Sequence, residues 1–303
     1  MNEPKRHHYL PQFYLKKFCK NGLFWVYDRT NNEYRQQTPV NTCVKKKYYT
    51  AIGPDGITHN KIESILADIE GKTKHIIEKI NRKILIDLED KCILAIFVAF
   101  LHYRVPEFEM EINELTEKFY KRYSKLAIPN EKVAEIIIKQ FVNTENRENL
   151  SPKELLAFVK NGNYRIKFSR EHSLRYMFFL ASELPLIFIQ MDWQFLYSSK
   201  NSSFITSDNP FIVNRPQNYN GPYGIGTKGA KKLIPLNSKV CLVMGDKGES
   251  LINRQIPSKD VRNINNRIAI ECNRFLISKD KSLLEKLVKI SKIDKWWIKS
   301  RVN

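Results

Sequence analysis

The spacing of apolar residues changes twice along the chain, which divides it into three regions. Residues 23–29 alternate as a strand does, around Trp25 and Tyr27, and the turn residues Asn31 and Asn32 lead into a returning partner at residues 33–38. From about residue 59 the spacing becomes helical, and beyond residue 191 short apolar runs separated by turn residues return. The order strand, helix, strand argues against regular alternation of strands and helices.

The middle region predicts several helices. Residues 59–80 carry one apolar stripe at helical spacing, and Glu63 and Glu70, seven residues apart, lie together at its margin. Residues 88–103 are apolar nearly all round, so this helix should be buried, and it ends at Arg104 before Pro106. Two amphipathic helices follow over residues 108–141, parted at 128–130, then one from Ser151 and one over 170–191 that Pro185 should kink or divide.

The third region predicts a sheet built from residues 193–213, 233–244 and 274–278, with helices at 258–272 and 282–290. We therefore expect an α+β fold with an N-terminal β-hairpin element, a helical middle and a mostly antiparallel C-terminal sheet. Residues 1–303 should form a single domain, with a β element at about 1–58, helices at about 59–191 and a β-rich part at about 192–303.

The charge of the chain favours polyanionic partners. Its 51 Lys and Arg outweigh 32 Asp and Glu, a net charge of +19, which points to nucleic acid first and an anionic membrane surface second. Genomic bias toward lysine is the competing explanation. The basic run Lys45, Lys46 and Lys47 stands beside Tyr48, a mixture that suits phosphate contact and base stacking. A solvated strand edge guarded by lysines is the alternative.

The cysteines and the apolar runs indicate a compartment. Five scattered cysteines without a C-x-x-C pair suggest neither a zinc ribbon nor a disulfide framework, and a reducing cytoplasm fits them. The first residues lack the apolar core of a signal peptide. Residues 92–101, the longest apolar run, reach only half of the roughly 20 residues that span a bilayer. We expect a cytoplasmic protein without a transmembrane segment, whose oligomeric state the sequence leaves open.

Residues 204–211, Phe-Ile-Thr-Ser-Asp-Asn-Pro-Phe, combine two apolar flanks with a polar corner. Pro210 pushes Asn209 out of the helical region, and Ser207 and Asp208 are residues that bond backbone amides two positions on. The corner is therefore either a site at a rigid strand end or a well-capped turn. Arg104, at the end of a buried helix, needs a carboxylate partner, and Glu70 and Asp208 are the candidates.

These landmarks together resemble a bacterial and phage-associated family, the domain of unknown function 4238. The resemblance runs through nearly the whole chain, in H-H-Y-L-P-Q-F-Y-L-K-K-F at 7–18, F-W-V-Y-D at 24–28, I-E-G-K at 69–72, F-L-H-Y-R-V-P at 100–106, F-I-T-S-D-N-P at 204–210, I-P-L-N-S at 234–238 and N-R-I-A-I-E-C-N-R-F at 266–275. The family usually has R-T-P where this chain has Arg104, Val105 and Pro106. The resemblance implies no established activity. The polar or special positions that match are His7, His8, Tyr9, Pro11, Glu70, Arg104, Asp208, Asn209, Pro210, Asn266 and Arg274.

Two functions compete on these residues. The first is a nuclease in a bacterial defence or toxin setting, which needs a base or a metal-bound water, an acid, and a cation for the developing charge. A divalent metal such as Mg²⁺ is its candidate cofactor, and its catalytic candidates are His7, His8, Glu70, Arg104 and Asp208. The second is a non-enzymatic module that binds nucleic acid or protein. A phosphate-ligand enzyme has only the glycines of residues 224–229, without the strand and helix that such a motif requires. For the first function we expect Asp208 to approach Arg104, with Glu70 and one of the two histidines in the same pocket.

Overall fold

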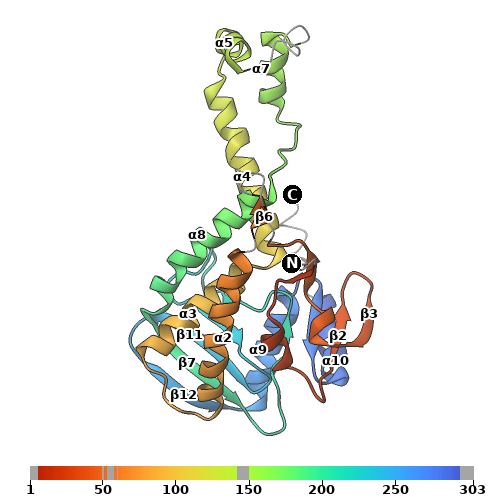
Figure 1. The fold of residues 1–303 in the computed structure, drawn as a ribbon, viewed down its shortest axis with the longest axis vertical. Coiled ribbons are helices and arrows are strands. Elements are labelled where there is room, and N and C mark those ends of the chain that lie inside the picture. The colour runs from red at the N-terminus through yellow and green to blue at the C-terminus, as the bar shows by residue number, and fades with distance from the viewer. Residues whose placement is uncertain (1–5, 50, 53–57, 60, 142–149, 294–303) are drawn as a thin grey trace. The chain divides into compact units, whose positions relative to one another are not determined.

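The computed structural model describes residues 6–49, 51–52, 58–59, 61–141 and 150–293 (Figure 1). It is a mixed α+β fold with small N-terminal sheets, a helical middle and a five-stranded C-terminal sheet. The predicted fold class is therefore confirmed. The chain divides into two compact units, Met1–Phe108 with Leu174–Asn303, and Glu109–Ser173. The single domain expected from the sequence stays a prediction.

The N-terminal part of the first unit is built from short strands. Its elements are β1 (Arg6–His8), α1 (Gln12–Lys16), β2 (Phe24–Asp28), β3 (Glu33–Gln37), η1 (Pro39–Asn41), β4 (Val44–Lys46), β5 (Ala51–Ile52) and β6 (Thr58–His59). β2 and β3 form the predicted hairpin, and Asn32 closes it with a φ of 54°, the left-handed backbone that asparagine tolerates. β1 pairs antiparallel with β4, which sets His7 opposite Lys45.

A four-stranded sheet joins this hairpin to the end of the chain, in the order β3-β2-β13-β8. Strand β13 (Phe275–Ser278) lies antiparallel to β2 and to β8 (Thr206–Ser207). The prediction that residues 274–278 join the C-terminal sheet is therefore wrong. Alternating apolar residues show which face of a strand is buried, but they do not name the strand that it pairs with.

The C-terminal sheet has the order β12-β7-β11-β10-β9. Its strands are β7 (Met191–Ser198), β9 (Ile212–Asn214), β10 (Lys231–Pro235), β11 (Val240–Lys247) and β12 (Leu251–Ile256). All pairs are antiparallel except that of β12 with β7, so the sheet is mostly antiparallel, as predicted. β12 was not expected because four of its six residues are exposed and it lacks a buried apolar face.

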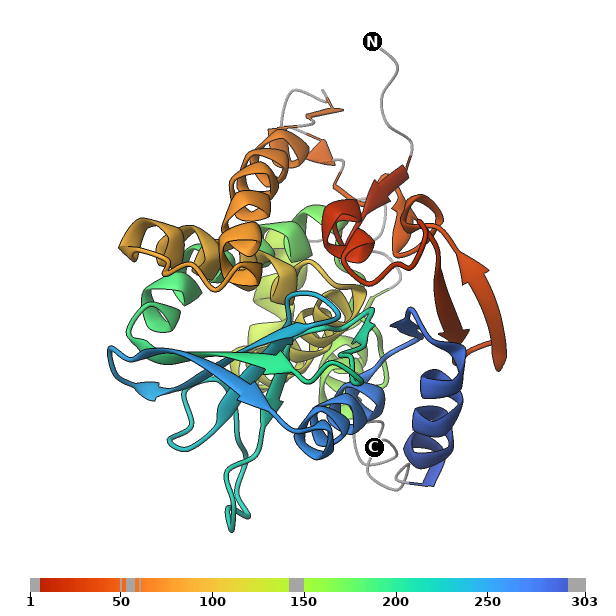
Figure 2. The ribbon, with the colours of Figure 1, turned by 90° about the horizontal axis from the view of Figure 1, so that it is seen from below.

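Helices cover these sheets. The first unit holds α2 (Lys61–Asn81), α3 (Leu88–Tyr103), most of α8 (Arg170–Phe188), α9 (Ser258–Glu271) and α10 (Lys281–Ile293). α3 is buried as predicted, and its apolar residues share one core with Trp193 and Phe195 of β7. Pro185 lies inside α8 without dividing it. α9 and α10 pack side by side below the four-stranded sheet (Figure 2).

The second unit contains most of α4 (Pro106–Ala127), with α5 (Glu131–Phe141) and α7 (Pro152–Asn161). α5 and α7 pack around Ala134 and Val159. Ser151 and Glu154 form a reciprocal capping box at the start of α7. The predicted break at residues 128–130 is confirmed. No helix in the described residues is long and apolar enough to cross a membrane.

Candidate functional site

A cavity of about 200 Å³ lies beside the first strand and helix of the chain. β1 holds the histidines in an extended strand, α2 turns Glu63 and Glu70 to one side because they are seven residues apart, and α3 ends at the cavity with Arg104. The residues that line it are His8, Pro11, Gln12, Phe13, Tyr49, Glu63, Leu66, Ala67, Glu70 and Arg104.

Arg104 is the buried cation of this cavity. Its Nη1 donates to Glu70 Oε1 at 2.7 Å, its Nε donates to the Tyr49 hydroxyl at 2.9 Å, and its Nη2 donates to the His8 carbonyl at 2.8 Å. Burial acts to lower the pKa of the guanidinium, but Tyr49 and Glu70 outweigh it and the pKa lies above its ordinary value. Arg104 is therefore charged and held in a fixed orientation.

Glu63 lines the same cavity and faces His7, which is buried behind it. The Tyr49 backbone N–H donates to His7 Nδ1 at 2.8 Å, so in the neutral ring the proton stands on Nε2. That Nε2 is buried, has no hydrogen-bond partner among the described residues, and lies 3.9 Å from Glu63 Oε2. The Glu63 side chain is 43% exposed. A carboxylate that solvent reaches thus stands beside a buried N–H group.

His8 contributes to the cavity mainly through its backbone. Its side-chain Nε2 lies 3.1 Å from the Val40 carbonyl, and its own carbonyl accepts from Arg104. Burial lowers the pKa of His8, against the carbonyl contacts that raise it. The imidazole is therefore neutral at pH 7.

Glu70, Arg104 and His8 line one cavity, as expected of Glu70, Arg104 and one of the two histidines, whereas His7 is not among the lining residues. The fifth candidate lies elsewhere, since Asp208 is not among the residues that line the cavity, and the prediction that it approaches Arg104 is wrong. Glu63 is the residue that the sequence reasoning passed over. The sequence feature that could have identified Glu63 is its seven-residue spacing from Glu70, which places both carboxylates at one margin of α2.

Asp208 is buried at the corner between β8 and β9. It accepts the backbone N–H groups of Asn273 at 3.1 Å and Arg274 at 2.8 Å, and the Cys272 thiol lies 3.6 Å from it. Burial raises the pKa of Asp208 to about 6, although these hydrogen bonds act to lower it. The partners of the Asp208 carboxylate are thus the backbone N–H groups just before β13, and not the Arg104 guanidinium that the sequence analysis expected.

Arg274 holds the neighbouring strand instead. Its Nε and Nη2 donate to the two oxygens of Asp28 at 3.0 and 2.9 Å, and Arg35 Nη1 donates to the same carboxylate at 3.2 Å. Burial acts to raise the pKa of Asp28, but Arg274 and Arg35 outweigh it and hold the pKa below its ordinary value. This bidentate pair joins β2 to the start of β13, at the register Phe275 opposite Asp28.

A comparison with known families assigns the chain. The family described as "Protein of unknown function (DUF4238)" matches residues 6–282, which include the cavity, the corner and the Asp28–Arg274 pair. This chain belongs to the DUF4238 family. No curated protein and no solved structure matches it.

The basic run of this DUF4238 protein is exposed only at its lysines. Lys45, Lys46 and Lys47 are exposed, whereas Tyr48 is 5% exposed and its ring packs edge-on against Tyr9 and Tyr49. The Lys45 ammonium stands 5.1 Å from the Tyr48 ring centre. The lysines are placed to contact phosphates, but a buried ring is not placed to stack on a base.

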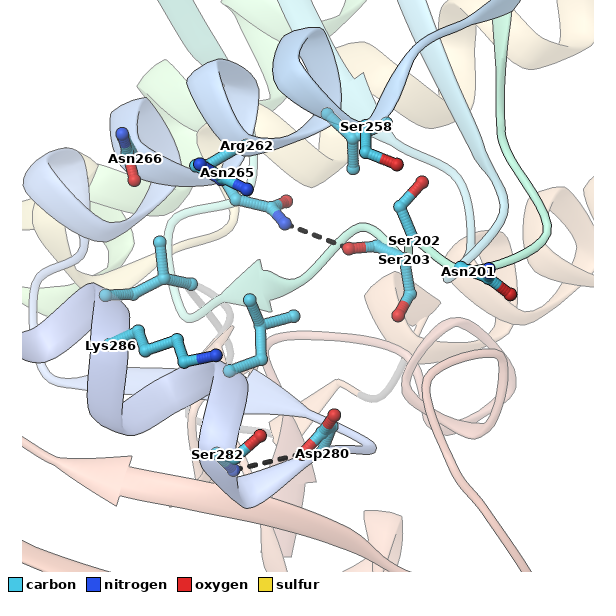
Figure 3. A pocket seen from close by; sticks show the side chains of 13 residues that line it. Asn201, Ser202, Ser203, Ser258, Arg262, Asn265, Asn266, Asp280, Ser282 and Lys286 are labelled. Atoms are coloured by element: carbon cyan, nitrogen blue, oxygen red, sulfur yellow. Dashed lines mark hydrogen bonds between the residues drawn. The ribbon is translucent and has the colours of Figure 1, made fainter.

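A second cavity, of about 490 Å³, opens between the first turns of α9 and α10 and the loop after β7 (Figure 3). Asn265 reaches across it to donate to the Ser203 carbonyl at 2.9 Å, and Lys286 extends into it from α10. Neither Lys286 nor Arg262 forms an ion pair with another described residue. The Asn266 oxygen is buried with no hydrogen-bond partner among the described residues. Of these residues, the family resemblance marks Asn266 alone.

The described residues contain no cluster of side chains arranged to bind the divalent metal that the nuclease hypothesis expects. No group of three or more His, Cys, Asp or Glu side chains there has an arrangement that could hold an ion. Glu63 and Glu70, with the neutral His8, are the ligand types that the cavity offers, and Glu70 is already bound to Arg104. In this family member the cavity therefore presents a cation and a carboxylate of its own.

Proposed function

We propose that this DUF4238 protein acts on nucleic acid as a phosphodiester-cleaving enzyme, and that the cavity at Arg104 is its active site. The observation that carries the proposal is the placing of a buried, oriented guanidinium and an accessible carboxylate, Glu63, in the wall of one cavity. Phosphoryl chemistry needs such a pair, because charge develops on the phosphoryl oxygens while a nucleophile loses its proton.

Glu63 is the candidate base in this scheme. It takes the proton of the attacking hydroxyl or water, and the buried His7 ring lies beside it, with Nε2 3.9 Å from Glu63 Oε2. Arg104 neutralises the charge that develops on the phosphoryl oxygens, and the leaving oxygen takes its proton from solvent. Three of the five guanidinium N–H groups serve Glu70, Tyr49 and the His8 carbonyl, which leaves two for a phosphate.

The other candidates have supporting roles in this proposal. Glu70 orients Arg104, and the His8 carbonyl does the same from β1. Asp208 holds the corner before β9 by its bonds to Asn273 and Arg274. The setting in bacterial defence and the cytoplasmic location belong to the same proposal, and the free state of all five cysteines is consistent with a reducing compartment.

A second function, binding without cleavage, is favoured by the exposed cations. Lys45, Lys46 and Lys47 form one exposed basic run, and Arg262 with Lys286 supplies a second set in the α9–α10 cavity. Under this function the Arg104 cluster is a structural pair that ties α3 to α2 and β1.

One variant pair tests the cleavage proposal. RNA and DNA oligonucleotides are incubated with the protein, with and without Mg²⁺, beside Glu63→Gln. Removal of a general base lowers such rates by about 10²- to 10⁴-fold, and the fold should survive because Glu63 is partly exposed. Asp68→Asn is the matched control, an exposed carboxylate on the same helix that pairs with Lys72.

The possible outcomes separate the two functions. Cleavage that is lost in Glu63→Gln and retained in Asp68→Asn supports the active site. Binding without cleavage by the unchanged protein favours the binding module, and cleavage that is unaffected by Glu63→Gln places the active site elsewhere.

A further inference from the structure

Four large apolar side chains stand exposed in a row on α4. Leu115 is 64% exposed, Phe119 62%, Tyr123 58% and Leu126 80%. Their spacing of four, four and three residues puts them on one face of the helix, which we call the apolar stripe. Single exposed apolar residues are ordinary, but a contiguous exposed stripe marks an interaction surface.

The charges beside the stripe change sign along the helix. Successive residues of an α-helix are 100° apart around its axis, and this angle places five exposed charged residues along one side of the apolar stripe. We call them the charged margin: Glu111, Glu114, Lys118, Arg122 and Lys125. Its first two members are acidic and its last three are basic. The margin is thus negative toward the start of α4 and positive toward its end.

We propose that the apolar stripe is the contact between two copies of this chain, α4 against α4 in antiparallel orientation, with the two-fold axis near Phe119. In a two-fold pair the same surface meets itself, so residue i contacts residue j and j contacts i. For antiparallel helices, the charged margin of one copy then runs alongside that of the other in the reverse direction. Glu111 and Glu114 of one copy face Arg122 and Lys125 of the second. A parallel pair would lack this reversed match and would set like-charged ends together.

The order of charges also has an explanation within one helix. Acidic residues near a helix start and basic residues near its end suit the helix dipole, and Glu114 pairs with Lys118 at 2.6 Å. Neither effect accounts for four exposed apolar side chains beside the margin. Self-pairing explains the stripe and the margin together, and it commits the surface to a second copy, because complementary charge selects partner and orientation.

Charge reversal tests the pairing on the full-length protein. We expect sedimentation equilibrium or light scattering to give twice the chain mass, falling to the single mass on dilution. Glu111→Lys with Glu114→Lys should be monomeric, and so should Arg122→Glu with Lys125→Glu. The two reversed proteins mixed in equal amounts should form a dimer, and the chain with all four reversals should dimerise again. Since these positions are exposed, the folded state should survive.

The control and the contrary results are distinct. Reversal of Glu135 and Lys139, an exposed pair on α5, should leave the dimer intact. A chain that is monomeric at every concentration overturns the proposal. So does a dimer that each reversed variant forms alone as readily as the unchanged chain, or a mass above two chains.

Discussion

Asp208 shows how one residue takes a role that its motif leaves undecided. Its place in a strand-end corner suits both a catalytic site and a capped turn. In the structure its carboxylate accepts hydrogen bonds from the backbone N–H groups of Asn273 and Arg274. Those amides lie more than sixty positions away in sequence, so no local pattern points to them. Arg104 is the contrasting case. A cation at the end of a buried helix demands a carboxylate, and Glu70 meets it as predicted.

Asp208 also predicts a pH effect of known sign. Burial raises its pKa to about 6 from an ordinary value of 3.8, so between these values the folded protein keeps a proton that the unfolded chain has lost. Stability therefore falls as the pH rises through this window, by about 3 kcal/mol, since each pKa unit is worth about 1.4 kcal/mol. Asp208→Asn cannot ionise and should lack this loss. Urea unfolding of both proteins at a series of pH values between 4 and 7 measures the difference.

The control for this experiment is Asp68→Asn, which removes an exposed carboxylate and should keep the profile of the unchanged protein. A constant difference in stability between Asp208→Asn and the unchanged protein across this range would show that Asp208 does not titrate there. Cleavage activity that disappears in a fully folded Asp208→Asn would return the residue to the catalytic candidates.

At the scale of elements, most helices and the hairpin follow from the sequence. The bounds of α3, α4, α5 and α9 agree with the apolar spacing. The spacing gives the extent of each helix but not which face is buried, since the apolar stripe of α4 is exposed. Strand partners do not follow in the same way. β12 is polar and joins the sheet by parallel pairing with β7, and β13 pairs with the N-terminal hairpin. For the site, spacing along α2 placed Glu63 beside Glu70, but only the fold shows His7 facing Glu63.

The Asp28–Arg274 pair is a side-chain ion pair that joins β2 to the start of β13, and it predicts a coupling between the two residues. A double-mutant cycle of Asp28→Asn and Arg274→Gln should give an interaction energy of about 0.5–3 kcal/mol, as contacting pairs do. Loss of Arg274 alone leaves Arg35 on the buried carboxylate, so Arg274→Gln should be milder than Asp28→Asn. Urea unfolding of the four proteins measures it. Strict additivity of the two substitutions would mean that the pair does not fix the register of β13.

At the scale of the whole molecule, the net charge of +19 is the feature with the widest consequence. Charge of one sign repels itself in the compact state and attracts polyanions. A lysine excess that reflects genomic bias would be spread without regard to function, whereas a binding surface concentrates it. Lys45, Lys46 and Lys47 stand exposed next to the β1–β4 pair, the same strand pair that holds His7 and His8 near the Arg104 cavity.

This placement predicts the salt dependence of binding. Each phosphate that a lysine neutralises contributes about −0.9 to the slope of log K against log salt for duplex DNA. Replacing Lys45, Lys46 and Lys47 by glutamine should therefore make the slope shallower by up to about 3 and weaken binding at low salt. The matched control replaces Lys132, Lys153 and Lys160, three exposed lysines of the second unit, which removes the same charge from another place. If both triple variants change the slope equally, the basic run is not a specific contact surface, and binding depends only on the net charge of the protein. If neither duplex DNA nor heparin binds at low salt, the excess of lysine has no polyanionic partner.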